Sequence, residues 1–151
     1  MYAVNTAIYN TRNYCERFLI LLDKWINDST NFIEEFVYGD MECFLKEFTD
    51  EDNCQILYRG LCLKNTNGRF NNYSDEELLE YLQKHKNVFA SSSRDFKIAK
   101  EFAEMDRTDD DELSLIVEME ADKFMYLPED TYEKEVILYK PRYTKILWKR
   151  F

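Results

Sequence analysis

Glycine and proline are scarce in this chain, which has 151 residues but only three Gly and two Pro. Because these residues dominate flexible and stiff linkers, their scarcity leaves little room for long connections between domains. The chain is long enough to bury a substantial core. Its composition, 45% hydrophobic and 16% aromatic, can fill one. We therefore expect a single folded domain over residues 1–151.

The histidine and cysteines of this chain do not follow the spacing that is typical of zinc sites. His85 is the single histidine, and Cys15, Cys43, Cys54 and Cys62 include no C-x-x-C pair. Structural zinc sites need closely spaced Cys and His ligands, so we expect no metal. The N-terminal residues show no secretion signal and the chain is not dense in cysteine. Reduced, mostly buried cysteines and a cytoplasmic location are the expectation.

Long apolar runs and an excess of positive charge are absent too. No apolar stretch approaches the roughly 20 residues that span a bilayer, so no membrane partner is expected. The 20 Lys and Arg against 30 Asp and Glu give a net charge of −10. Phosphate backbones attract cations, so this charge disfavours nucleic acid as a direct ligand. The negative charge fits a protein partner with a basic surface. It is also consistent with an acidic protein that mimics nucleic acid.

Apolar side chains recur at helical spacing through the first 50 residues. Helices are predicted over residues 11–27, 32–37 and 41–48, and Gly39 would end the second. We interpret residues 1–50 as a helical scaffold.

The remaining part, residues 54–151, alternates strand and helix patterns, which predicts an α+β fold. Strands are expected near residues 54–62, 88–93, 113–120, 133–139 and 144–151, and helices near residues 74–86 and 95–103. The segment from Ser74 to Glu77 predicts a capping-box variant at the start of the first of these helices.

A lone charge, Arg59, interrupts the first predicted strand. Burying a charge is costly unless it is paired, so Arg59 lies either on an exposed edge or in a site with an anionic partner. Its fork of donors suits a phosphate or carboxylate. Gly60 would let a ligand approach the backbone closely. A structural ion pair is an equally good explanation.

Three serines, Ser91, Ser92 and Ser93, connect a short strand to a helix. In a strand Ser91 and Ser93 would share a face, where their hydroxyls can orient a ligand or another side chain. The alternative is a serine-rich turn that caps the helix. Farther on, Glu133 and Glu135 are two residues apart, so both would project from one strand face about 7 Å apart.

These three features in this order resemble the mono-ADP-ribosyltransferases of the arginine–serine–glutamate class, of the phage or bacterial effector type. The matching segments are LYRGL at 57–61, FASSSRDFKIAKEFA at 89–103 and EKEVIL at 133–138. The resemblance covers roughly residues 55–150. It implies a core of two packed, mainly antiparallel sheets with N-terminal helices, with residues 54–151 binding NAD as co-substrate.

The resemblance also implies roles for individual residues. Glu135 would stabilise the oxocarbenium-like transition state and bind a ribose hydroxyl. Ser91 would hold Glu135 in place, Arg59 would grip an NAD phosphate, and Gly60 and Ser93 would line the NAD site.

Further roles concern the second phosphate contact and the acceptor. Arg107 falls where related enzymes often have a second phosphate-binding Arg, and it matters more because Gly60 follows Arg59 where some members have another Arg. Glu133 would select an arginine acceptor, since a carboxylate can orient a guanidinium and take its proton. Tyr132 would belong to the acceptor-recognition turn. Ser92 departs from the Thr that is more usual there.

The function implied is transfer of ADP-ribose from NAD to an arginine of an intracellular target protein, with release of nicotinamide. Two alternatives remain open. One is a noncatalytic acidic interaction or inhibitor protein on a transferase-like fold. The other is the same chemistry on asparagine or nucleic acid, for which a local basic patch could compensate the net charge: Lys140, Arg142, Lys145, Lys149 and Arg150.

Overall fold

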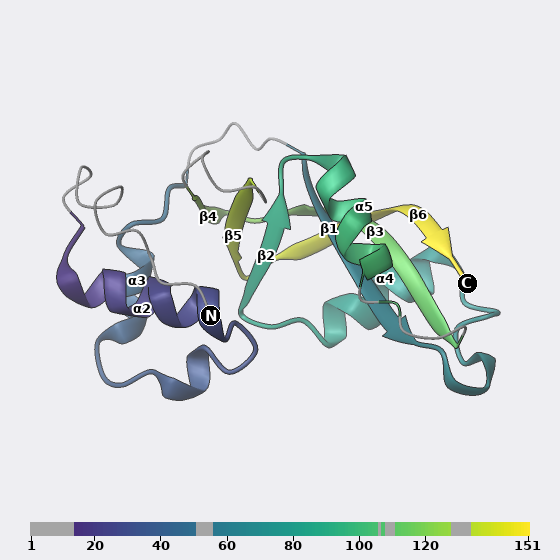
Figure 1. Cartoon of the computed structure of the whole chain (residues 1–151), viewed down its shortest axis with the longest axis horizontal. Helices are drawn as coiled ribbons and strands as arrows, with labels where there is room; N and C mark the ends of the chain where they lie inside the picture. Colours follow the sequence, from purple (N-terminus) through teal and green to yellow (C-terminus); the bar gives the residue numbers. More distant parts are fainter. Residues whose placement is uncertain (1–13, 51–55, 106, 108–110, 128–133) are drawn as a thin grey trace. The chain divides into compact units, whose positions relative to one another are not determined.

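A computed structural model describes residues 14–50, 56–105, 107, 111–127 and 134–151 (Figure 1). The chain divides into two compact units, Met1–Phe48 and Thr49–Phe151.

The first unit contains α2 (Glu16–Asn27), a short 3-10 helix η1 (Ile33–Glu35) and α3 (Asp40–Leu45). The apolar spacing of α2 is confirmed, because its buried side chains form one stripe. The second predicted helix shrinks to the single turn of η1, since Phe36 has an extended backbone at φ −67° and ψ 135°. Gly39, at φ +88°, precedes α3 as its N-cap instead of ending a helix. The buried residues of α2 are Phe18, Leu21, Leu22 and Trp25.

One buried carboxylate ties α2 to α3. Asp40 is 3% exposed, and its oxygens accept hydrogen bonds from Arg17 Nε at 2.9 Å and Nη2 at 2.6 Å. The backbone N–H of Val37 donates to the same carboxylate at 3.0 Å. Beside it Phe44 stacks against Phe18 with ring centroids 5.5 Å apart. Paired charge and aromatic packing therefore hold this unit together.

The second unit is a six-stranded antiparallel sheet with the order β4-β5-β2-β1-β3-β6 (Figure 1). Its strands are β1 (Leu57–Lys64), β2 (Phe89–Ser93), β3 (Glu112–Glu120), β4 (Lys123–Tyr126), β5 (Glu135–Tyr139) and β6 (Arg142–Arg150); its helices are η2 (Thr66–Gly68), α4 (Asp75–Lys84) and α5 (Phe96–Met105).

The described residues form one sheet, where the resemblance implied two packed sheets. The sheet is nevertheless weakly joined in the middle, because β1 and β2 share the single pair Tyr58↔Ser93. By contrast β1 pairs with β3 along its whole length, and β2 pairs with β5 from Phe89 to Ser93. Two three-stranded halves, β4-β5-β2 and β1-β3-β6, therefore meet at one residue pair. The α+β class and the antiparallel strands agree with expectation.

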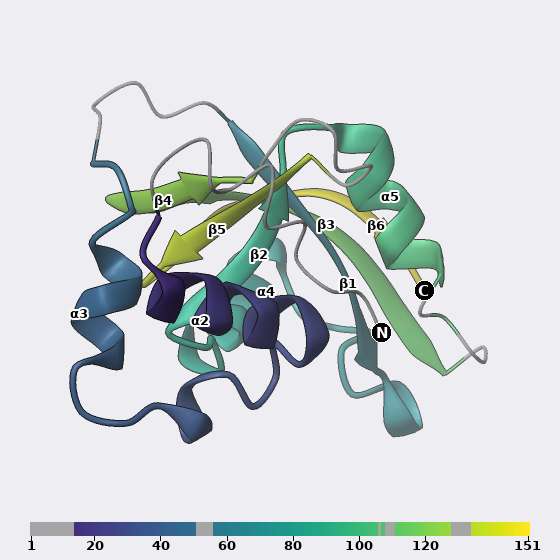
Figure 2. The same ribbon diagram turned by 60° about the vertical axis from the view of Figure 1, so that its left-hand side comes forward.

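The two faces of the sheet are covered by different helices. One face carries the main core, in which Leu78 and Leu82 of α4 pack with Val117 and Leu138. On the other face α5 lies along β1 and β3 (Figure 2), with Ala99 against Ile116. The capping box predicted at Ser74 is present at the start of α4.

Gly60 permits the close approach of α5 to β1. A Cβ at this position would lie 1.7 Å from the carbonyl oxygen of Ala99 and 2.8 Å from the backbone nitrogen of Ala103. The expectation that Gly60 leaves its backbone open to a ligand is therefore corrected: the helix backbone fills that space.

Candidate active site

Glu135 starts β5 beside the serine-rich strand β2. Its Cα partner is Ser93, and partners in an antiparallel pair present their side chains on the same face. Ser91 lies two residues earlier in β2 and shares that face. Glu135 is 9% exposed and Ser93 4% exposed. The fold thus brings a buried carboxylate and two serine hydroxyls onto one patch of neighbouring strands.

The remaining serine points the other way. Ser92 is 5% exposed, and its hydroxyl donates to the carbonyl oxygen of Val136 at 2.8 Å. The Ser92 side chain therefore links β2 to β5.

Ser93 also acts at the turn into α5. Its hydroxyl oxygen accepts a hydrogen bond from the N–H of Asp95 at 3.1 Å, and Asp95 Oδ1 accepts one from the N–H of Lys97 at 2.9 Å. Ser93 therefore belongs both to the turn that leads into α5 and to the face that carries Glu135.

The residue before Glu135 is held in an unusual conformation. Lys134 has φ +46°, which is costly for a residue with a side chain. Its carbonyl accepts the N–H of Arg94 at 3.4 Å and its ammonium lies 3.5 Å from Asp95 Oδ2. These contacts join the start of β5 to the end of β2. They therefore fix the backbone at the point where Glu135 begins β5.

An open pocket of about 490 Å³ adjoins this patch, lined by Tyr58, Arg94, Asp95, Phe96 and Lys134. Tyr58 is the β1 partner of Ser93, and its ring packs edge-on against Phe96 with centroids 5.6 Å apart. Glu135, Ser91 and Ser93 do not themselves line this pocket, which borders Glu135 and Ser93 through their chain neighbours Lys134 and Arg94. It has an aromatic wall and both signs of charge on its rim.

Arg59 lies on the opposite face of the sheet. It pairs with Val117, and the neighbouring odd-numbered residues of β1, Leu57 and Leu61, pack in the α4-side core. From that side its Nη1 donates to the carbonyl oxygen of Ser91 at 3.3 Å. Arg59 therefore reaches the backbone of β2, whereas the predicted meeting of its guanidinium with the Ser91 hydroxyl and Glu135 on one face is not found.

Arg107 lies at the far end of the sheet. Its Nη1 donates to the carbonyl oxygen of Arg150 at 3.0 Å and lies 3.4 Å from Ser114 Oγ. Ser114 is four residues along β3 from Glu118, the partner of Tyr58, or about 13 Å at the usual strand rise. This position does not suit the second phosphate contact that the resemblance implied.

The predicted acceptor residues, Tyr132 and Glu133, lie outside the described residues, as does most of the preceding loop. Their roles stay predictions.

Sequence reasoning missed Tyr58 and Phe96. Strand alternation carried the signal for Tyr58, since Tyr58 and Gly60 must share the face opposite Arg59. Phe96 falls at the apolar spacing of its helix, which predicts burial, yet it is 39% exposed. Nothing in the sequence pairs the two rings, because they meet only through the Tyr58↔Ser93 pairing.

The thiols differ from expectation. Cys15 is exposed and Cys43 and Cys62 are half-buried, so the prediction of mostly buried cysteines is wrong for these three. Cys62 donates to Glu112 Oε2 at 2.9 Å. Burial, helped by that carboxylate, raises the pKa of Cys62 to about 11, which makes it a poor nucleophile.

The basic patch considered for nucleic acid is partly neutralised. Arg142 contacts Glu120 at 3.1 Å and Asp122 at 3.0 Å, and Lys149 contacts Asp75 at 2.6 Å. These ion pairs reduce the charge available to a phosphate backbone.

Within the described ranges, no three Cys, His, Asp or Glu side chains gather as metal ligands would. None of the helices in the same ranges combines the length and apolar character needed to cross a bilayer. Comparison of the chain with protein-family models, curated proteins and solved structures gives no match.

Proposed function

We propose that the chain is an NAD-dependent mono-ADP-ribosyltransferase that modifies arginine on a protein. The observation that carries this proposal is the register pair Ser93↔Glu135, with Ser91 on the same face and a pocket of about 490 Å³ beside it. The resemblance assigns the reacting centre to this serine–glutamate set.

The chemistry needs a negative group below the ribose of NAD. As the bond between ribose C1′ and the nicotinamide nitrogen breaks, positive charge develops on C1′ and the ring oxygen. A carboxylate that is largely removed from water attracts this charge more strongly than an exposed one would. Glu135, 9% exposed, meets this requirement. Nicotinamide leaves with the bonding electrons, and Tyr58 and Phe96 offer its flat ring an aromatic surface.

An arginine guanidinium then attacks C1′ and must lose one proton. Glu133 is the base in this proposal, following the resemblance. Arg59 becomes a positioning residue, because its contact is with the carbonyl of Ser91 and not with the reacting face. That bond fixes β2 beside the weak β1–β2 junction.

A noncatalytic interaction protein is the second candidate. It is favoured by the positions of Arg59, on the opposite face, and Arg107, at the far end of the sheet. The face of Glu135 therefore lacks the two arginines that the resemblance assigns to the phosphates.

Activity measured with a nearly isosteric variant separates the two candidates. The protein is incubated with NAD labelled in the adenylate phosphate and with a cell extract; hydroxylamine-sensitive label on protein and released nicotinamide are measured. Glu135→Gln should lower both by about 10²- to 10³-fold, the usual cost of losing one electrostatic contact to a transition state. Glu104→Gln, an exposed carboxylate of α5, should stay within about twofold of wild type.

A third variant tests the acceptor role. Glu133→Gln should keep nicotinamide release while losing transfer to arginine. Absence of nicotinamide release by the wild type would favour the noncatalytic candidate. Full activity of Glu135→Gln would instead contradict the catalytic role of Glu135.

A further inference from the structure

A second pocket, of about 280 Å³, opens on the α4 side of the sheet where β1 and β2 separate. Arg59 and Ala90 lie on the two separating strands, and Tyr81, His85 and Lys86 come from α4 and the residues just after it. Tyr143 of β6 also lines the pocket. The pocket lies on the face opposite Glu135.

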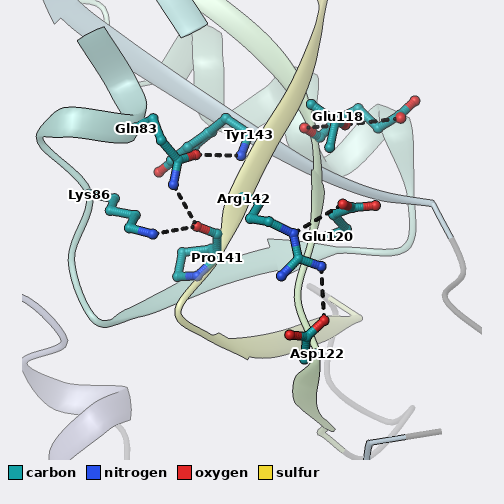
Figure 3. Close-up of polar contacts among 9 residues, drawn as sticks. Gln83, Lys86, Glu118, Glu120, Asp122, Pro141, Arg142 and Tyr143 are labelled. Atoms are coloured by element: carbon teal, nitrogen blue, oxygen red, sulfur yellow. Dashed lines mark hydrogen bonds and ion pairs between the residues drawn. The ribbon is translucent and has the colours of Figure 1, made fainter. Parts of the chain in front are cut away.

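Its two cations lack acidic partners. Arg59 donates to the carbonyl of Ser91 at 3.3 Å, and Lys86 Nζ donates to the carbonyl of Pro141 at 3.3 Å (Figure 3). No carboxylate of the described residues comes within 4.0 Å of either group. In a chain of net charge −10, this pocket keeps positive charge that carbonyl dipoles only partly offset.

The adjacent residue shows the contrast. Arg142 follows Pro141 directly, yet its guanidinium is matched by Glu120 and Asp122 (Figure 3). Arg142 thus has two carboxylate partners where the neighbouring pocket cations have none among the described residues.

The rim of the pocket is held in place before any ligand arrives. Gln83 donates through Nε2 to the carbonyl of Pro141 at 3.3 Å and accepts the N–H of Tyr143 at 3.0 Å (Figure 3). This side chain fastens the end of α4 to the start of β6. Lys86 and Tyr143 are therefore positioned by the fold, which lowers the entropy cost of binding.

The wall combines flat rings with an apolar floor. The Tyr81 and His85 rings lie 4.4 Å apart at an angle of 43°. Leu82 and Ala90 are buried beneath. An arginine fork and a lysine suit a phosphate, and the rings suit a planar base.

We propose that this pocket binds a nucleoside 5′-monophosphate, with the phosphate between Arg59 and Lys86 and the base against Tyr81 and His85. The proposal does not rest on transferase activity, because the pocket and Glu135 lie on opposite faces.

Calorimetric titration with AMP, adenosine and inorganic phosphate tests this site. AMP should bind saturably with a Kd of about 10–500 μM, and adenosine and phosphate alone should each bind at least about tenfold more weakly. Lys86→Gln should weaken AMP about tenfold by removing one charge-assisted contact. Lys84→Gln, which changes an exposed lysine at the end of α4 outside the pocket lining, should change the affinity less than about twofold.

The same titration in the Glu135→Gln variant should give wild-type affinity, which separates this site from the proposed active site. The pocket assignment is overturned if AMP gives no saturable heat up to about 5 mM, a limit weaker than ordinary ligand sites. It is also overturned if adenosine binds as tightly as AMP, or if Lys84→Gln and Lys86→Gln weaken binding equally.

Discussion

At the scale of single residues, the buried carboxylate of Asp40 accepts three hydrogen bonds. The hydrogen bonds from Arg17 lower the pKa of Asp40 below its ordinary value of 3.8; burial opposes this shift and the Val37 N–H adds to it. A lowered folded-state pKa means that protonation favours the unfolded chain. The stabilisation is therefore complete above about pH 4 and is lost as the pH falls through the lowered value.

Asp40→Asn should lower the free energy of unfolding at pH 7 by about 1–3 kcal/mol, since the buried charged acceptor of the Arg17 and Val37 donors is lost. The difference from wild type should shrink as the pH falls below 4. Urea unfolding followed by tryptophan fluorescence measures both. Glu42→Gln, an exposed carboxylate of the same helix, serves as control and should change stability by less than about 0.5 kcal/mol. A pH-independent difference for Asp40→Asn would refute the charge explanation.

Arg59 shows at the same scale how strand alternation divides neighbouring side chains between two faces. Tyr58 lines the pocket beside Glu135, whereas Arg59 lines the pocket on the α4 side. Two adjacent residues of one motif thus belong to different sites.

At the scale of elements, helix α5 packs directly against the backbone of strand β1 at Gly60. Ala99 and Ala103 keep the facing surface of the helix small, and Gly60 removes the side chain of the strand. The small residues of each element are therefore explained by the close packing of the helix on the strand.

Gly60→Ala should lower stability by about 3 kcal/mol or more, because the added methyl would overlap the Ala99 carbonyl and α5 would have to move. Chemical denaturation measures this change. Ala99→Gly should not rescue the variant, since the overlap is with main-chain atoms. Gly39→Ala has no atom within 4 Å of the new methyl and should lose only about 1–2 kcal/mol through its positive φ. Equal losses for the two alanine variants would mean that backbone conformation, not the α5 contact, explains Gly60.

The net charge of −10 acts at the scale of the whole molecule. An acidic enzyme attracts a basic protein substrate over distances that salt screens, with a Debye length near 10 Å at 0.1 M. A small acceptor with one positive charge feels the same field only weakly.

Given the proposed activity, modification of an arginine-rich basic protein should fall about tenfold between 20 and 300 mM NaCl. Transfer to free agmatine should change less than about threefold over the same range. Initial rates with both acceptors measure the effect. Equal salt dependence for the two acceptors would rule out steering by the net charge.

Local patterns predicted much of the fold. The stripe of α2, the capping box at Ser74 and the strand-to-helix step around Ser93 all depend on residues within about one turn of each other. The resemblance implied that Ser91 holds Glu135, whereas the strand register pairs Glu135 with Ser93 and Ser91 with Ile137. Local spacing could not give this register, because these residues are far apart in the chain.

The face on which Arg59 lies, the use of Gly60 and the remote position of Arg107 were not predictable in this way. Each depends on which strand or helix becomes the neighbour, and that choice is made by packing across the whole sheet.

The sequence alone determined most of the helices and strands, although not β4, together with the acidic charge and the polar residues available for chemistry, because these follow from side chains and their short spacings. Only the tertiary structure decided that Glu135 sits with Ser91 and Ser93 while Arg59 joins Lys86 in a separate pocket. The physical reason is that strand pairing sets the face of every side chain at once, and pairing joins residues that the sequence keeps apart.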